Sequence, residues 1–147
     1  MLVSKKSLYA IRALLELTAD FEQKPVNSAT IAKRQGVSSR FIEIILNELK
    51  HAGIVESRRG SSGGYLLGKH PRDISVLDVI SCIDGPISIV SQTKDEKKVD
   101  YFGNNTLNGL WTKIQSEIKS DLEARTLKDL FEEEKAFRNK NICNYSI

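Results

Sequence analysis

Apolar residues recur three or four positions apart in three stretches of the first half of the chain, at about 4–21, 29–35 and 39–52. This spacing places them on one face of a helix. Ser38 is a favourable N-cap residue before the third stretch, and Gly36 suits the left-handed end of the second. The pattern therefore predicts three short helices, the last two of which meet at a tight turn.

Two short apolar runs follow, at 54–57 and 65–67, and they flank a turn that is rich in glycine and arginine. Short strands around a glycine-rich turn are typical of a β-hairpin. The order helix, turn, helix and hairpin is that of a winged helix-turn-helix, in which the hairpin turn at 58–64 is the wing. We expect a mostly α-helical fold with one small β-hairpin.

The second half of the chain is organised differently. Apolar residues at helical spacing predict a short helix at 76–83, a long one at about 106–125 and a last short helix to residue 131. Residues 87–105 lack periodicity and carry a charged run, which indicates an exposed loop. The sequence thus predicts a winged helix-turn-helix domain at 1–72, a short helix and sensor-type loop at 73–105, a dimerisation helix with a short packing helix at 106–131, and a fraying tail at 132–147.

Charge separates the two halves as well. Residues 1–70 hold 11 lysines and arginines against 6 acidic residues, whereas residues 71–147 hold 11 against 13. A basic front half and a mildly acidic back half indicate a nucleic-acid face on the front half only. Chance variation in surface charge is the alternative that this count leaves open.

Several classes of protein are disfavoured by what the sequence lacks. No run approaches the ~20 apolar residues of a membrane span, and no signal peptide precedes the first helix, so we expect a cytoplasmic protein. Cys82 and Cys143 are too few and too distant for a disulfide framework or a zinc site. His51 and His70 are isolated, and neither paired carboxylates nor a phosphate-binding loop stands out. We therefore expect no metal, no cofactor and no catalytic activity.

The first turn of the third helix has the chemistry of a DNA-reading element. An α-helix fits the major groove of B-DNA, and its exposed N-terminal side chains reach the base edges. Ser38 and Ser39 can donate to phosphates or bases, and Arg40 can bind a guanine edge or a phosphate. One turn later, Glu43 can accept from a cytosine amino group and Ile44 can contact a thymine methyl. A solvated glutamate remains the alternative for Glu43.

The wing adds arginines on a thin, flexible tip. Arginine in this setting suits the narrow minor groove and the phosphates that flank it. A surface hairpin with two stray arginines is the alternative, but this hairpin follows a helix-turn-helix directly. In the first helix, Lys5 is either a phosphate contact or a solvated lysine. The predicted DNA contacts outside the third helix are Lys5, Arg58, Arg59, Gly60, Ser61, Ser62 and Gly63.

These segments resemble a known family. The matching residues lie in the first helix, before and within the third helix, and across the wing, where the chain reads RRG and then GGYLL, at 7–10, 31–38, 41–43, 55–60 and 63–67. In these segments the chain is similar to the IscR/NsrR/CymR family of bacterial winged-helix transcription regulators, often called the Rrf-two family. The similarity is dense over residues 1–90 and follows the apolar pattern alone over 105–131.

The resemblance implies a homodimer. Members of the family cross their long helices at the dimer axis. The alternative role for the apolar residues of this helix is packing within one chain. Two reading helices related by a two-fold axis would bind a pseudo-palindromic site in double-stranded DNA. The expected dimer contacts are Leu107, Leu110, Trp111, Ile114 and Ile118.

One departure from the family pattern concerns the loop before the long helix. Iron–sulfur members carry three cysteines there, whereas residues 87–105 contain none, and Gln92, Lys98 and Asn105 stand near the ligand positions. Cluster ligation needs thiolate donors, so we predict no iron–sulfur site. Cys82 is expected to be a small buried hydrophobe. The loop remains the place where we expect a signal to act, and the expected signal is a small molecule, a thiol state or another protein.

The sequence therefore predicts a DNA-binding transcription regulator that acts as a homodimer, as a repressor and without an iron–sulfur cluster. A winged-helix protein-interaction module that does not bind DNA is the competing hypothesis. The basic wing discriminates between them, because an interaction module has no need of Arg58, Arg59 and an exposed turn at 38–40.

Overall fold

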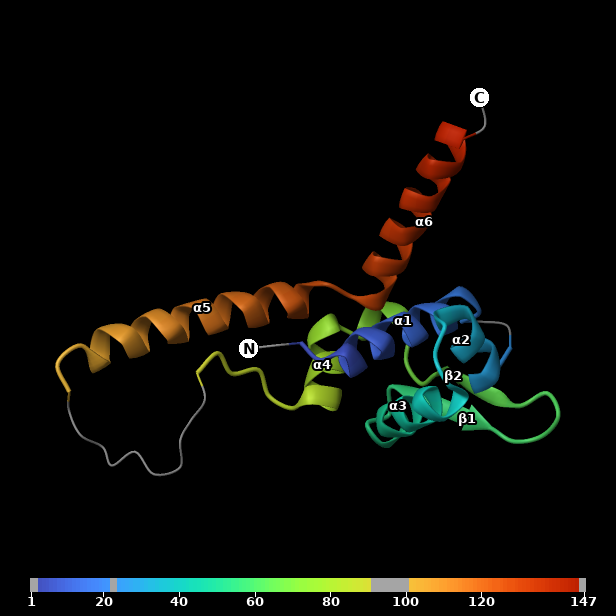
Figure 1. Cartoon of the computed structure of the whole chain (residues 1–147), viewed down its shortest axis with the longest axis horizontal. Coiled ribbons are helices and arrows are strands. Elements are labelled where there is room, and N and C mark those ends of the chain that lie inside the picture. Colours follow the sequence, from blue (N-terminus) through green and yellow to red (C-terminus); the bar gives the residue numbers. More distant parts are fainter. Residues whose placement is uncertain (1–2, 22–23, 91–100, 146–147) are drawn as a thin grey trace.

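The computed structural model describes residues 3–21, 24–90 and 101–145, with side chains to residue 141. Helices dominate the described part, and its strands form one antiparallel hairpin, which confirms the predicted fold class. Figure 1 shows a body built from the first part of the chain, from which two helices project. In chain order the elements are α1 Lys5–Ala19, α2 Ser28–Gln35, α3 Ser39–His51, β1 Val55–Arg58, β2 Gly64–Leu67, the 3₁₀ turn η1 Pro71–Asp73, α4 Val76–Asp84, α5 Asn104–Ala124 and α6 Leu127–Tyr145.

The core of the body forms around α1, which packs against α2, α3, α4, β2 and α6. Its buried side contributes Leu14 and Leu17, and α3 contributes the buried residues Ile42, Leu46 and Leu49. Each such aliphatic side chain stabilises the fold by about 1.5–3 kcal/mol when it leaves water. The apolar face predicted for the third helix therefore packs against α1, and this fixes the position of α3. On the first helix the buried face includes Leu17, and Leu8 of the predicted face is 44% exposed.

The turn between α2 and α3 forms as its residues predict. Gly36 ends α2 in the left-handed conformation, with φ 69°. The Oγ atom of Ser38 accepts from the backbone N–H of Phe41 at 3.2 Å and so caps α3. Both predictions about the turn are confirmed, and the cap leaves the first turn of α3 at the surface.

The hairpin is tied to the helices through the segment before α2. Val55 pairs with Leu67 and Arg58 pairs with Gly64 across the two strands. On the other edge of β2, Tyr65 exchanges two backbone hydrogen bonds of 2.8 Å with Val26. The wing is thus anchored directly beside the start of α2.

The last helix is longer than the sequence analysis predicts. A short helix to residue 131 was expected, followed by a fraying tail at 132–147, but α6 continues to Tyr145. Thr126 and Asp129 cap its start by two reciprocal hydrogen bonds of 3.0 and 3.2 Å. Ion pairs spaced four residues apart, such as Arg138 with Glu134 at 2.8 Å, support the helix beyond residue 131. The charged residues beyond 131 therefore form a solvated helix and not a fraying tail.

Candidate nucleic-acid interface

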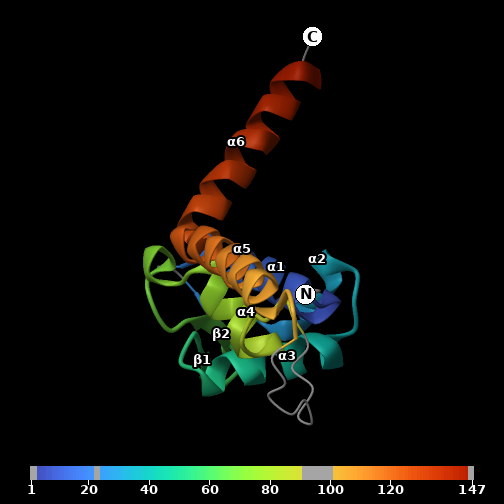
Figure 2. The same ribbon diagram turned by 90° about the vertical axis from the view of Figure 1, so that its left-hand side faces the viewer.

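The predicted reading residues lie together on the exposed first turns of α3. Ser38 and Arg40 are exposed, Ser39 and Glu43 are half-buried, and the side chain of Ile44 is 41% exposed. Figures 1 and 2 place α3 and the hairpin on the side of the body that faces away from α6. This surface is free of the two projecting helices and is open to a long ligand.

The wing presents its basic residues to solvent. Arg58, Arg59 and the turn residues 60–62 are exposed, and Gly63 is half-buried. A hydrogen bond of 3.0 Å from the Gly63 N–H to the Gly60 carbonyl closes the turn. A Cβ atom at Gly63 would lie 2.2 Å from the carbonyl oxygen of Arg58, so a residue with a side chain does not fit there without a shift of the backbone. Glycine is therefore required by the close approach of the turn at Gly63 to the backbone of Arg58.

The arginines divide into two groups by their partners. Four arginines outside the predicted DNA face lie within 4 Å of a carboxylate, namely Arg34, Arg72, Arg125 and Arg138. Arg12 stacks over the ring of Tyr9, 5.3 Å from its centroid. Within the described part of the chain, Arg40, Arg58 and Arg59 have neither kind of partner. Of the arginines in this part of the chain, the three with neither an ion pair nor a ring contact are the three predicted to contact DNA.

The two lysines at the start of α1 have different surroundings. Lys6 forms an ion pair with Glu48 of α3, so its charge joins α1 to α3. Lys5 is exposed. The surface therefore offers Lys5, but not Lys6, as an additional phosphate contact.

The predicted dimer residues lie on α5, which projects from the body and contains no buried residue. Leu107, Leu110 and Trp111 are 50%, 46% and 37% exposed. Ile114 is half-buried, and Ile118 packs against the small apolar cluster of Val76, Ile80 and Ile87. Packing within the chain therefore accounts for the end of the stripe near Ile118 but leaves its N-terminal part uncovered.

Comparison with known proteins identifies the fold. A profile of the Rrf2 family, described as iron-dependent transcriptional regulators, matches residues 3–133. The chain is 33% identical over 130 residues to the regulator CymR of Bacillus subtilis, covering 88% of this chain and 89% of CymR. It is 35% identical over 135 residues to IscR of Vibrio atlanticus, covering 90% of this chain and 76% of IscR. The chain belongs to the Rrf2 family.

Solved Rrf2 structures agree with this assignment. The structure of CymR, the global cysteine regulator of B. subtilis, superimposes with a TM-score of 0.77 at 32% identity, covering 90% of this chain and 97% of CymR. The IscR structure of T. potens gives 0.73 at 32% identity, covering 91% and 88%. The curated relatives are helix-turn-helix transcriptional regulators. The protein is accordingly a DNA-binding transcription regulator, and no helix in its described part is long and apolar enough to cross a membrane.

The potential metal ligands of this chain do not fit the iron–sulfur cluster that the iron-dependent members of the family imply. Among the described residues, no group of three His, Cys, Asp or Glu side chains could hold a metal ion. Residues 91–100 lie outside the described residues, and with them most of the predicted sensor-type loop, but their sequence contains neither cysteine nor histidine. Cys143 belongs to α6, far along the chain from Cys82. Thiolate ligation of an iron–sulfur cluster within one subunit lacks its ligands here.

Cys82 has the surroundings of a structural thiol. Its Sγ atom donates to the backbone carbonyl of Glu48 at 3.7 Å, and the side chain is half-buried between α4 and α3. Burial raises the pKa of the Cys82 thiol, and the negative charge of Glu48 raises it further, while Lys6 opposes both. A protonated thiol is a poor nucleophile and a poor metal ligand.

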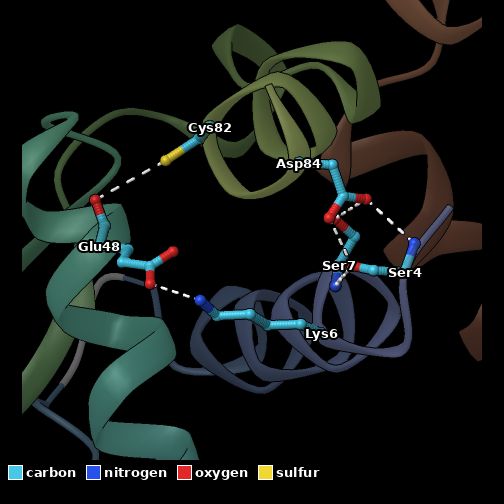
Figure 3. A network of polar contacts seen from close by, with 6 residues as sticks. All are labelled: Ser4, Lys6, Ser7, Glu48, Cys82 and Asp84. Carbon is cyan, nitrogen blue, oxygen red and sulfur yellow. Dashed lines mark hydrogen bonds and ion pairs between the residues drawn. The ribbon is translucent and has the colours of Figure 1, made fainter. Parts of the chain in front are cut away.

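A polar network that the sequence analysis missed joins α1 to the end of α4 (Figure 3). The carboxylate of Asp84 accepts from the backbone N–H of Ser4 at 3.0 Å and from its hydroxyl at 2.5 Å. It also accepts from the hydroxyl of Ser7, a fully buried residue, at 2.8 Å. A carboxylate at a helix C-terminus opposes the helix dipole, so these bonds explain how Asp84 is tolerated there. The Ser4, Ser7 and Asp84 network fixes the start of α1, which carries Lys5.

The same network makes a contribution to stability that depends on pH. Partial burial raises the pKa of Asp84, but the hydrogen bonds from Ser4 and Ser7 and the charge of Lys6 outweigh it, so the net pKa lies below the usual value. A lowered folded-state pKa stabilises the protein above the unfolded pKa of about 4, and that stabilisation is lost as pH falls through the folded-state value.

Asp84→Asn is therefore expected to lower the free energy of unfolding at pH 7 by roughly 1 kcal/mol, a modest value because the carboxylate is exposed. The difference from the unaltered protein should shrink below about pH 4. Urea denaturation at pH 7 and pH 3 measures it, with Asp121→Asn, at an exposed position of α5, as the control. An equal difference at both pH values would contradict the role of the charge.

Proposed function

We propose that this Rrf2-family regulator is a cytoplasmic homodimer that represses transcription by binding a pseudo-palindromic DNA site, without catalytic activity and without an iron–sulfur cluster. Each subunit places the first turns of α3 in a major groove and the wing against the adjacent minor groove. The contacts to DNA come from Lys5, Ser38, Ser39, Arg40, Glu43, Ile44, Arg58, Arg59 and the glycine and serine residues at 60–63.

The unpartnered arginines are the observation that supports this DNA interface. Among the described residues, no carboxylate lies within 4 Å of Arg40, Arg58 or Arg59, whereas four other arginines have one at that distance. A guanidinium group binds phosphate or a guanine edge most strongly when no carboxylate competes for its donors. The three arginines occur on the reading helix and the wing, the two elements that a winged helix uses on DNA.

The exposed stripe of α5 supports the dimer. Leu107, Leu110 and Trp111 form an apolar surface on a helix that projects away from its own body. Exposed apolar surface of this kind marks an interaction site, and a two-fold axis lets one such stripe cover another. The dimer then sets the distance between two reading helices.

The DNA interface is tested by the salt dependence of binding. Arg59→Ala is expected to weaken binding to duplex DNA and to reduce the slope of log affinity against log salt by about 0.9, the value for one phosphate contact. Fluorescence anisotropy with a random duplex, measured at several salt concentrations, provides the slope. Arg138→Ala is the matched control, because Arg138 lies on α6 and is paired with Glu134.

The outcomes separate the proposal from its competitor. If the unaltered protein shows no salt-sensitive binding to any duplex, the protein-interaction module is favoured. An unchanged slope for Arg59→Ala removes the wing from the interface. Repression is tested separately by transcription in vitro from a promoter that carries a site selected from a random DNA pool; increased transcription would assign activation instead.

A further inference from the structure

The predicted base-reading carboxylate has a hydrogen-bond partner on the neighbouring helix. The hydroxyl of Ser28, the first residue of α2, donates to Oε1 of Glu43 on α3 at 3.3 Å. Both side chains are half-buried. Within the described part of the chain, Glu43 has no cationic group within 4 Å, so no ion pair competes with this contact.

Ser28 is not needed to cap its own helix. The side chain of Asn27 accepts from the backbone N–H of Thr30 at 3.1 Å and performs that role. The Ser28 hydroxyl is therefore available to the carboxylate. The contact is also favoured by charge, because the positive end of the α2 dipole lies where Ser28 begins the helix.

We propose that Ser28 is a positioning residue that determines which base Glu43 selects, an inference that rests on the DNA-binding role proposed above. A glutamate on a helix surface samples several rotamers, and a bond from Ser28 restricts the carboxylate to one of them. With Oε1 engaged by the hydroxyl, Oε2 is left to accept from an exocyclic amino group such as that of cytosine. The fixed carboxylate also repels bases and phosphates that would place an acceptor there.

A second role for Ser28 makes a different prediction. The first helix of a helix-turn-helix crosses the DNA backbone, so the hydroxyl of Ser28 could instead donate to a phosphate. A phosphate contact changes affinity for all sequences alike, whereas a positioning contact changes the preference among bases. The two roles are therefore separable by measuring selectivity instead of affinity alone.

The experiment begins with selection of bound duplexes from a random pool by the unaltered protein and by Glu43→Ala. The base pair whose preference Glu43→Ala relaxes identifies the position that Glu43 reads. Dissociation constants are then measured on four duplexes that differ only at that base pair, for Ser28→Ala, Ser28→Thr, Glu43→Ala and the Ser28→Ala/Glu43→Ala double variant. Thr30→Ala, an exposed residue in the same turn of α2, is the control.

We expect Ser28→Ala to reduce discrimination at that position by roughly 5-fold, the low end of what one good base contact provides. Ser28→Thr keeps the hydroxyl and should restore it, and Thr30→Ala should leave it unchanged. Because Ser28 acts through Glu43, the double variant should discriminate no less than Glu43→Ala alone.

Other results overturn the inference. If Ser28→Ala lowers affinity for all four duplexes equally, Ser28 contacts the backbone directly. If it reduces discrimination further in the Glu43→Ala background, Ser28 reads DNA without Glu43. A failure of the unaltered protein to bind or select any duplex would instead refute the proposed function, so the two failures are distinct.

Discussion

The Trp111→Ala variant is expected to be a monomer at concentrations where the unaltered protein is a dimer, and to bind its DNA site at least about 30-fold more weakly. Trp111 is 37% exposed in the single chain, beside the more exposed Leu110. Loss of a central aromatic side chain from an interface costs about 2–4 kcal/mol, and a two-fold axis removes it from both subunits. Separated subunits lose the affinity that comes from binding two half-sites together.

Sedimentation velocity measures the oligomeric state, and circular dichroism verifies that the helices remain folded. Lys113→Ala is the matched control, because Lys113 is exposed and lies outside the apolar stripe of α5. A Trp111→Ala monomer with unchanged DNA affinity would contradict the dimer argument. A monomeric unaltered protein would contradict it as well.

The helix-turn-helix and the hairpin could be predicted because their signals are local. Gly36 and Ser38 each set the backbone within a few residues of themselves, and the glycines of the wing do the same. The apolar spacing on the third helix also reports directly which of its faces meets the core. Local signals of this kind need no knowledge of distant parts of the chain.

The polar contacts between helices could not be predicted in the same way. Ser4 and Asp84 are 80 residues apart, and Ser28 and Glu43 belong to different helices. Nothing in either sequence context distinguishes these residues from ordinary solvated ones, because the contact exists only after the helices have packed. From the sequence, Glu43 is either a base contact or a solvated side chain. Its hydrogen bond with Ser28 is visible only in the folded chain.

The length of α6 could not be predicted for a different reason. Helix formation by residues 132–145 depends on ion pairs along the helix and on its capped start, because that segment has few apolar residues to form a buried stripe. Hydrophobic periodicity is the main signal for a helix, and it is nearly absent there. The other indication of a helix in this segment is its content of helix-forming residues such as glutamate, lysine and alanine.

The Gly64→Ala variant is expected to lose about 3 kcal/mol of stability and most of its DNA affinity, because the wing would separate from the body. Gly64 has φ +153°, and an added Cβ would lie 2.6 Å from the backbone carbon and oxygen of Val26. The strand must therefore move away from Val26 and break the two hydrogen bonds that Tyr65 makes with it. Arg58 pairs with Gly64, so the displacement carries the basic tip with it.

Urea denaturation and fluorescence anisotropy on a selected duplex measure the two effects of Gly64→Ala. Gly109→Ala makes the same chemical change in α5 with no atom within 4 Å of the new Cβ, on the face opposite the apolar stripe. The control should leave DNA affinity unchanged and stabilise the helix by up to about 1 kcal/mol. If Gly64→Ala binds DNA normally, the anchoring of the wing by Val26 is not required for recognition, and the basic tip must reach the minor groove as a mobile loop.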